Sequence, residues 1–130
     1  MKIEIEVGRD ILENVFVTAI EGGSNHWCYL GEEAIDIIRK VVPKDDDKFL
    51  STALLRAVFD CGVVVPVNDA ENEDDVLGYL SRDTFKERIE SLMEDKDHSW
   101  ALINEILESG DALSSDIVFQ YLVMGEAIFG

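Results

Sequence analysis

The chain has 130 residues, 47% of them hydrophobic, so it can bury a core as one domain and is too apolar to be disordered. It carries 28 acidic and 11 basic residues, a formal net charge of −17. This charge repels phosphate groups, so we expect no direct nucleic-acid binding and no attachment to anionic membranes. Basic protein surfaces and metal ions are compatible with it. We therefore expect residues 1–130 to form a single compact acidic domain.

The N-terminus and the cysteines bear on the cellular compartment. The start, MKIEIEVGRD, lacks the apolar core of a signal peptide, and no apolar run reaches transmembrane length. Cys28 and Cys61 form neither a CxxC pair nor a zinc-binding spacing. One disulfide between them stays open, but two free thiols in a reducing compartment fit better. We expect a cytoplasmic protein, located in the host cytoplasm if a phage encodes it.

The N-terminal region predicts a strand followed by a helix. Residues 3–7 alternate apolar and charged side chains, which indicates a half-buried strand. Apolar residues at helical spacing over residues 11–20 predict an amphipathic helix. Asp10 and Glu13 resemble a capping box at the start of this helix, and Gly22–Gly23 mark its end.

The elements that follow are less regular. His26–Leu30 is rich in aromatic residues and predicts a second strand. Residues 34–42 fit a helical face stopped by Pro43, although their Ile and Val content leaves a strand as the alternative. Residues 50–61 predict a helix that Gly62 terminates.

A hairpin with an acidic turn is expected in the middle of the chain. Val63–Val67 predicts a strand, and Pro66 inside it indicates a sheet edge or a neighbouring bulge. Val76–Leu80 predicts the returning arm. The acidic turn between them is Asp69–Asp75.

Three helices are expected in the C-terminal part. Residues 85–93 predict one that begins near Ser81 or Asp83, and residues 100–107 predict one capped by Ser99. The inward residues of the second are expected to be Trp100, Ile103, Ile106 and Leu107, with Gly110 at its end.

The last helix is expected to run from Asp116 to about Met124, beginning at Ser114 or Ser115. It is apolar almost all round, which predicts a buried central position. The fold class is therefore α+β: about four short strands in a small mixed or antiparallel sheet, packed with four to six helices, with the C-terminal helix buried.

The acidic turn is the first candidate site. A calcium-binding EF-hand loop starting at Asp69 would need glycine at its sixth position and glutamate at its twelfth, where this chain has Asp74 and Leu80. The alternatives are a solvated turn and a patch that binds a basic partner. The acidic residues of this candidate patch are Asp69, Glu71, Glu73, Asp74 and Asp75.

The segment Gly22–Trp27 (GGSNHW) is the second candidate. Gly22 and Gly23 permit unusual backbone angles and close approach of another group. Asn25 and His26 offer hydrogen-bonding groups beside the large apolar surface of Trp27. The alternative is a helix stop followed by a strand that carries a core tryptophan.

The C-terminal run of residues 111–130 is the third candidate. Asp111 and Asp116 flank a helix start, where the helix dipole favours negative charge, and that role suffices for Asp116. Gln120 lies in an otherwise apolar helix, so its amide needs partners, which we expect in a strand or in the Gly22–Trp27 segment. We expect Glu126 to be held similarly.

Catalytic and metal-binding patterns are absent from the sequence. Residues 22–26 do not match GxSxG, and no GxxxxGK[ST] phosphate-binding loop occurs. A dyad of Cys28 with His26 or His98 is conceivable, but on a strand residues 26 and 28 share a face without the geometry that a base needs. We assign no cofactor and no metal site, although a carboxylate site for Mg²⁺ or Mn²⁺ stays open.

Two segments, VFVTAIEGGSNHWC (residues 15–28) and DALSSDIVFQYLVMGEAIFG (residues 111–130), resemble a group of small proteins encoded by tailed phages and prophages. The departures from the group's pattern are mild: His26, Ser115 and Phe129. The resemblance implies a phage origin and a shared fold, but no mechanism. The matching residues are Thr18, Gly22, Gly23, Trp27, Asp111, Asp116, Gln120, Gly125, Glu126 and Gly130.

Three functions follow from these features. We rank first a non-catalytic binding protein that meets a basic surface on another protein, for example as a DNA mimic that inhibits a nucleic-acid-processing protein. The second is a small enzyme or a metal- or ligand-binding domain, in which Gly22–Trp27 and Asp111–Glu126 share one pocket. The third is a virion or assembly component.

Overall fold

The structure, a computed structural model, describes residues 7–129. In this range it contains six α-helices and a three-stranded antiparallel sheet, so the predicted α+β class is confirmed with one strand fewer than the four expected. Residues 3–6 of the predicted first strand lie outside the described residues, and Val7 belongs to no regular element. The helices are α1 (Arg9–Thr18), α2 (Glu32–Val41), α3 (Leu50–Leu55), α4 (Arg82–Glu94), α5 (Ser99–Ile106) and α6 (Ala112–Met124), and the strands are β1 (Cys28–Tyr29), β2 (Val65–Asp69) and β3 (Val76–Leu80).

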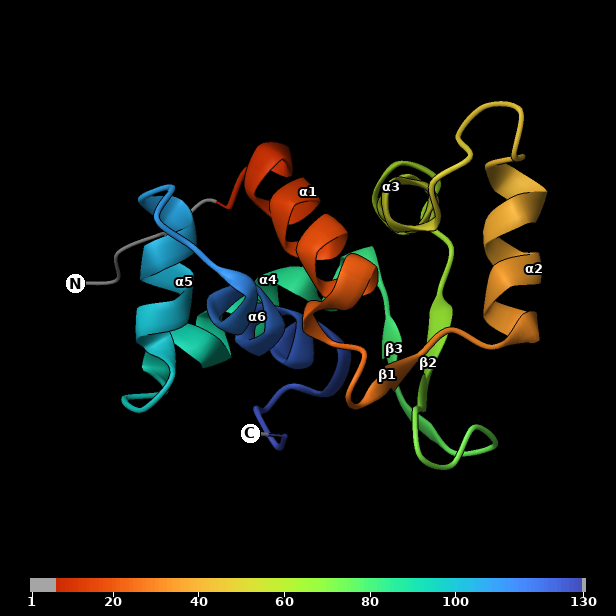
Figure 1. The fold of residues 1–130 in the computed structure, drawn as a ribbon. Coiled ribbons are helices and arrows are strands. Elements are labelled where there is room, and N and C mark those ends of the chain that lie inside the picture. The colour runs from red at the N-terminus through yellow and green to blue at the C-terminus, as the bar shows by residue number, and fades with distance from the viewer. Residues whose placement is uncertain (1–6, 130) are drawn as a thin grey trace.

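Helix α6 lies in the middle of the molecule (Figure 1) and contacts α1, α4, α5 and β3. The ten residues of α6 from 114 to 123 are all buried, which confirms the predicted central helix. The sheet, α2 and α3 lie to one side of α6, and α5 lies to the other (Figure 1). None of the helices within residues 7–129 combines the length and apolar composition of a bilayer span.

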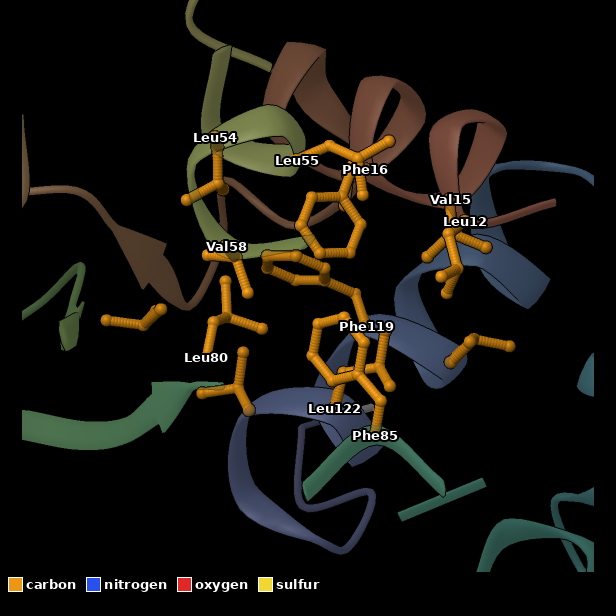
Figure 2. Packing of buried hydrophobic residues seen from close by; sticks show 14 of the residues in the cluster. Leu12, Val15, Phe16, Leu54, Leu55, Val58, Leu80, Phe85, Phe119 and Leu122 are labelled. Carbon is orange, nitrogen blue, oxygen red and sulfur yellow. The ribbon is translucent and has the colours of Figure 1, made fainter. Parts of the chain in front are cut away.

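Aromatic rings join the helices to each other at the centre of the core (Figure 2). The ring of Phe16 in α1 meets Phe119 in α6 edge to face, with centroids 5.4 Å apart, and meets Phe85 in α4 at 6.1 Å. Such edge-to-face pairs add to the stabilisation that burial of the rings provides. The core extends from this cluster toward α3 and the sheet through Leu54, Leu55, Val58 and Leu80.

The sheet has the order β1-β2-β3, and the predicted hairpin of β2 and β3 is confirmed. Pro66 lies in the central strand, so the expectation of an edge strand is wrong, while the alternative of a neighbouring bulge is confirmed by the register shift between Val67 and Asn68. Strand β1 pairs only with Asn68 and Asp69, so it does not reach Pro66. Proline is therefore tolerated because no ladder bond to β1 is required at its position.

Gly78 in β3 explains how closely α6 approaches the sheet. A Cβ atom at this position would lie 2.2 Å from the carbonyl oxygen of Val123 in α6. No side-chain rearrangement relieves contact with a backbone atom, so only glycine fits here.

Several helix ends differ from the predictions. Helix α1 begins at Arg9 with Gly8 as N-cap, so Asp10 lies in the first turn and makes no capping box with Glu13. The helix continues as a π-helical turn over Ala19–Gly23, which confirms that the two glycines end it. Helix α3 continues similarly over Arg56–Asp60, before Gly62.

The strand predicted over His26–Leu30 is shorter than expected, because only Cys28–Tyr29 pair with β2. The helix predicted over residues 34–42 is confirmed as α2, and the strand alternative is wrong. At the start of α4, Ser81 occupies the N-cap position but makes no side-chain cap.

The N-terminus of α6 is also different from the prediction. Asp111, rather than Ser114 or Ser115, is the N-cap, and its carboxylate accepts a 2.9 Å hydrogen bond from the Ser114 backbone N–H. The Ser114 hydroxyl accepts one from the Asp111 backbone N–H in return. Asp116 lies beyond the first turn, so the helix dipole does not account for it.

Helix α5 buries a different face from the one predicted. Its buried residues are Ala101, Leu102 and Glu105, whereas Trp100, Ile103 and Leu107 are exposed by 38%, 42% and 68%. Of the four predicted inward residues, only Ile106 packs against the core. His98 is the N-cap in place of Ser99, and the helix ends before Leu107 rather than at Gly110. Both faces of α5 are apolar, so periodicity alone does not determine which one is buried.

Candidate functional site

The two segments singled out in the sequence meet at Asp116. This residue of α6 is 3% exposed. Its Oδ1 accepts a 2.6 Å hydrogen bond from the Ser24 hydroxyl and a 2.7 Å hydrogen bond from the indole N–H of Trp27. Asp116 therefore fixes the Gly22–Trp27 segment to the central helix, and the role predicted from the helix dipole is wrong.

Gln120 extends this network one turn along α6. Its Nε2 donates to Asp116 Oδ2 at 3.0 Å and to the carbonyl oxygen of Phe129 at 2.9 Å. Its Oε1 accepts 2.9 Å hydrogen bonds from the backbone N–H groups of Ile128 and Phe129. The buried amide is thus fully partnered, as expected, but its direct partners lie in the C-terminal segment rather than in a strand or in Gly22–Trp27.

Trp27 is the large apolar component of the junction. It is fully buried, and its ring stacks on Phe129 with centroids 5.6 Å apart and an interplanar angle of 5°. Gly22 has a φ of 154°, which non-glycine residues rarely adopt, and this turn redirects the chain from α1 toward Trp27. The adjacent Gly23 lies close to the backbone oxygens of Thr18 and Ala112.

The reactive groups near the junction are few. The Asn25 side chain is exposed and makes no hydrogen bond within residues 7–129, although its backbone N–H donates to the Gly22 carbonyl oxygen at 3.4 Å. His26 is also exposed, with Nε2 3.7 Å from Asp116 Oδ2, beyond hydrogen-bonding distance. Burial, with a contribution from the Asp116 charge, raises the pKa of the Cys28 thiol to about 12. Cys28 is therefore a thiol rather than a thiolate at neutral pH, which makes it a poor nucleophile.

Each side-chain oxygen of Asp116 and Gln120, and the Gln120 nitrogen, already has a hydrogen-bond partner within the protein. Over residues 7–129, Arg39 Nε is the one buried side-chain nitrogen or oxygen without a partner. Glu126, which we expected to be tied down like Gln120, is exposed. The two segments therefore meet as a buried, self-satisfied junction.

The acidic turn between β2 and β3 is well ordered by its own hydrogen bonds. Asp69 Oδ1 accepts from the Glu71 backbone N–H at 2.8 Å, and Asn72 Nδ2 donates to Asp75 Oδ2 at 2.9 Å. The Ala70 backbone N–H donates to the carbonyl oxygen of Trp27 at 2.8 Å, which joins the turn to the buried junction.

The carboxylates of this turn face solvent. Glu71, Glu73, Asp74 and Asp75 are exposed, and Asp69 is partly buried. None of these carboxylates takes part in an ion pair formed within residues 7–129. The turn therefore presents uncompensated negative charge on a defined backbone.

A polar pocket of about 390 Å³ lies between α1 and the α5–α6 connection. Its deepest acidic residue, Glu105, is 7% exposed, and its Oε1 accepts hydrogen bonds from the hydroxyls of Ser114 at 2.8 Å and Ser115 at 2.5 Å. Nothing in the local sequence distinguishes this glutamate from the other acidic residues, so it was not predicted. The polar side chains lining the pocket come from Asn14, Thr18, Glu105, Glu108, Asp111 and Ser115.

A second cluster of side chains that was not predicted links α4, α5 and α6. The Asp95 carboxylate accepts a hydrogen bond from the Tyr121 hydroxyl and lies 2.7 Å from Nδ1 of His98. These two hydrogen bonds, the one from Tyr121 first, lower the pKa of Asp95 to about 2. Burial and then the hydrogen bond to Asp95 raise the pKa of Tyr121. Asp95 and His98 are neighbours in the turn between α4 and α5, and only the packing of α6 brings Tyr121 to them.

No group of three or more His, Cys, Asp and Glu residues within the described range is arranged to hold a metal ion. Both cysteines are free thiols. Comparison of the chain with protein-family models, with curated proteins and with solved structures found no match in any of the three.

Proposed function

We propose that this protein is a non-catalytic binding protein that engages a basic surface on another protein through the acidic turn between β2 and β3. The observation that carries this proposal is the set of exposed, unpaired carboxylates of Glu71, Glu73, Asp74 and Asp75 on an ordered turn. Charge held on a fixed backbone attracts a complementary surface without the entropic cost of ordering the turn on binding.

The buried junction supports binding rather than catalysis. Gly22–Trp27 and Asp111–Glu126, the segments that would form an enzyme site, do meet. The polar side chains at their meeting point, however, form hydrogen bonds with each other. The nearby thiol of Cys28 is protonated at neutral pH. This arrangement is what a scaffold requires, since it holds the acidic turn against the core through Ala70 and Trp27.

The partner we propose is a nucleic-acid-processing protein, whose basic groove the carboxylates of the turn would occupy in place of phosphates. The resemblance to phage-encoded proteins stays a prediction, and it suggests a bacterial partner in the host cytoplasm. The net charge of −17 opposes direct binding of this protein to nucleic acid.

The experiment is affinity capture from bacterial lysate at low salt, with bound proteins identified by mass spectrometry and then eluted with duplex DNA. We expect the wild type to retain a basic nucleic-acid-binding protein that both duplex DNA and raised salt release. The variant Glu71→Gln, Glu73→Gln, Asp74→Asn removes three charges whose side chains make no hydrogen bonds within residues 7–129, and it should lose the captured protein.

A matched control removes the same number of exposed charges elsewhere. Glu13→Gln, Glu33→Gln, Asp36→Asn changes net charge equally, on α1 and α2. Retention of the partner by this control and its loss by the turn variant would support the proposal. Equal retention by both variants, or a partner that duplex DNA does not displace, would contradict it.

A further inference from the structure

Helix α5 presents an apolar stripe to solvent. Trp100, Ile103 and Leu107 follow one another at helical spacing on the face opposite the buried Ala101 and Leu102, and they are 38%, 42% and 68% exposed. The stripe carries no charged side chain. Contiguous exposed apolar surface of this kind is typical of sites where another protein binds.

Trp100 is held in place within this stripe. Its indole Nε1 donates a 3.0 Å hydrogen bond to the carbonyl oxygen of Asp97, in the turn before α5. A tryptophan fixed in this way presents its ring at little further cost in conformational entropy, which is the property of an interface anchor. Trp27, by contrast, is fully buried.

The stripe ends at the acidic pocket. Leu107 is followed directly by Glu108, whose side chain lines the pocket of about 390 Å³ together with the carboxylates of Glu105 and Asp111. No lysine or arginine lines this pocket, and none occurs in the chain from Asp97 to its end. An apolar stripe therefore adjoins a concave site with uncompensated negative charge.

Glu108 occupies an unfavourable backbone conformation. Its φ is 58°, and it is the one residue other than glycine with a positive φ among those described. This position after a helix normally carries glycine or asparagine, because a Cβ atom is disfavoured there. A carboxylate is present at the pocket despite this conformational cost.

We propose that α5 and the adjoining pocket form a docking surface for a basic amphipathic helix of another protein. Its apolar residues would pack on Trp100, Ile103 and Leu107, and a lysine or arginine would pair with the exposed Glu108 at the edge of the pocket. Charge complementarity selects this occupant: a second copy of the chain would bring a further net charge of −17 against the same face. Helix-in-groove recognition uses this combination of apolar anchors and flanking charge.

This surface is separate from the acidic turn, which lies on the other side of the molecule (Figure 1). The inference shares with the proposed function only the idea of a binding protein. The Glu71, Glu73, Asp74 variant of the turn should therefore bind the α5 partner normally, so that failure of one proposal is distinguishable from failure of the other.

The test uses a synthetic helical peptide with leucines along one face and lysines along its flanks. Two controls are a peptide with glutamate in place of each lysine and a scrambled peptide of the same composition. Because Trp100 is partly exposed and Trp27 is buried, binding should shift tryptophan emission to shorter wavelength and protect it from quenching. The signal should be absent in Trp100→Phe, and neither control peptide should produce it in the wild type.

Two sets of variants separate the contributions of the stripe and the pocket. Ile103→Ser with Leu107→Ser leaves the net charge unchanged and should weaken peptide binding by about tenfold or more, as loss of interface anchors does. The matched control, Phe49→Ser, removes an aromatic ring that is 56% exposed outside this surface and should not change affinity. Glu108→Gly should raise the melting temperature and still weaken binding, which a purely structural role of Glu108 does not predict.

Each remaining outcome overturns the proposal. Unchanged affinity of the Ile103, Leu107 double variant would show that the peptide binds by net charge alone. A wild-type dimer without peptide that this variant abolishes would identify a second copy as the occupant. A gain in peptide affinity on removal of residues 1–6 would identify the chain's own N-terminal segment instead.

Discussion

Replacement of Asp116 tests whether the buried junction holds the two halves of the chain together. In Asp116→Ala, the indole N–H of Trp27 and the hydroxyl of Ser24 lose their shared acceptor, which lies 2.7 Å and 2.6 Å away in the wild type. Each buried donor left without a partner costs about 1–3 kcal/mol. We expect the free energy of unfolding to fall by about 3–5 kcal/mol, a large part of the roughly 5–15 kcal/mol of a typical domain.

Asp116→Asn should have a smaller effect, for a specific geometric reason. The Asn carbonyl oxygen can still accept from Trp27 and Ser24, but its amide then faces Nε2 of Gln120, donor against donor. Gln120 cannot rotate its amide to compensate, because its Oε1 already accepts two backbone N–H groups. We expect the free energy of unfolding to fall by about 1–3 kcal/mol, because the hydrogen bonds no longer have a charged acceptor and two N–H donors face each other.

The measurement is urea unfolding at neutral pH, monitored by tryptophan fluorescence and circular dichroism. The slope of the unfolding free energy against urea concentration should be the same in the variants and the wild type, which checks two-state behaviour. Asp74→Ala, on the exposed turn, serves as the matched control and should change stability by no more than about 0.5 kcal/mol. A loss below about 1 kcal/mol for Asp116→Ala would refute the idea that this junction stabilises the fold.

Gly78→Ala should destabilise the protein by about 1–3 kcal/mol, measured by urea unfolding, because its Cβ would meet the Val123 carbonyl oxygen at 2.2 Å. Hydrogen bonds with Tyr121 first and His98 second lower the pKa of Asp95 from 3.8 to about 2. The stabilisation that the ionised Asp95 carboxylate gives is therefore complete above the higher value and is lost as the pH falls toward the lower one. Thermal melts across that pH range should show a smaller fall in melting temperature with decreasing pH for Asp95→Asn than for the wild type. Glu108→Gly should stabilise the protein by about 1 kcal/mol in urea unfolding, because its φ is 58°.

Each of these expectations has a result that would contradict it. Wild-type stability of Gly78→Ala would mean that α6 and the sheet separate at no cost. If the melting temperature of Asp95→Asn fell with decreasing pH as steeply as that of the wild type, the acid sensitivity would come from other carboxylates. Glu108→Gln retains the strained backbone, so a gain in stability equal to that of Glu108→Gly would trace the effect to charge rather than to φ.

Local sequence signals predicted many elements of this protein correctly. The apolar residues around the whole of α6 predicted its burial, since such a helix has no side to expose. The acidic run between two strand-like segments predicted the turn of the hairpin, and paired glycines predicted the end of α1. Gln120 was recognised because an amide in an apolar helix requires partners.

Choices between equally apolar or equally polar alternatives were decided only by the tertiary structure. Both faces of α5 are apolar, so the packing against α6 determined that Leu102 is buried and Leu107 exposed. One of 28 acidic residues, Asp116, became the centre of the junction because the Gly22 turn brings Ser24 and Trp27 to it.

The physical reason is the range over which each property acts. Helix and strand periodicity, glycine turns and net charge are properties of neighbouring residues, and the sequence states them directly. The partner of a buried carboxylate lies far away along the chain: Ser24 and Trp27 are separated from Asp116 by 92 and 89 positions. Such pairings exist only after the core has formed, so composition and spacing determined the domain and its charge, while packing decided which charges became structural and which remained at the surface.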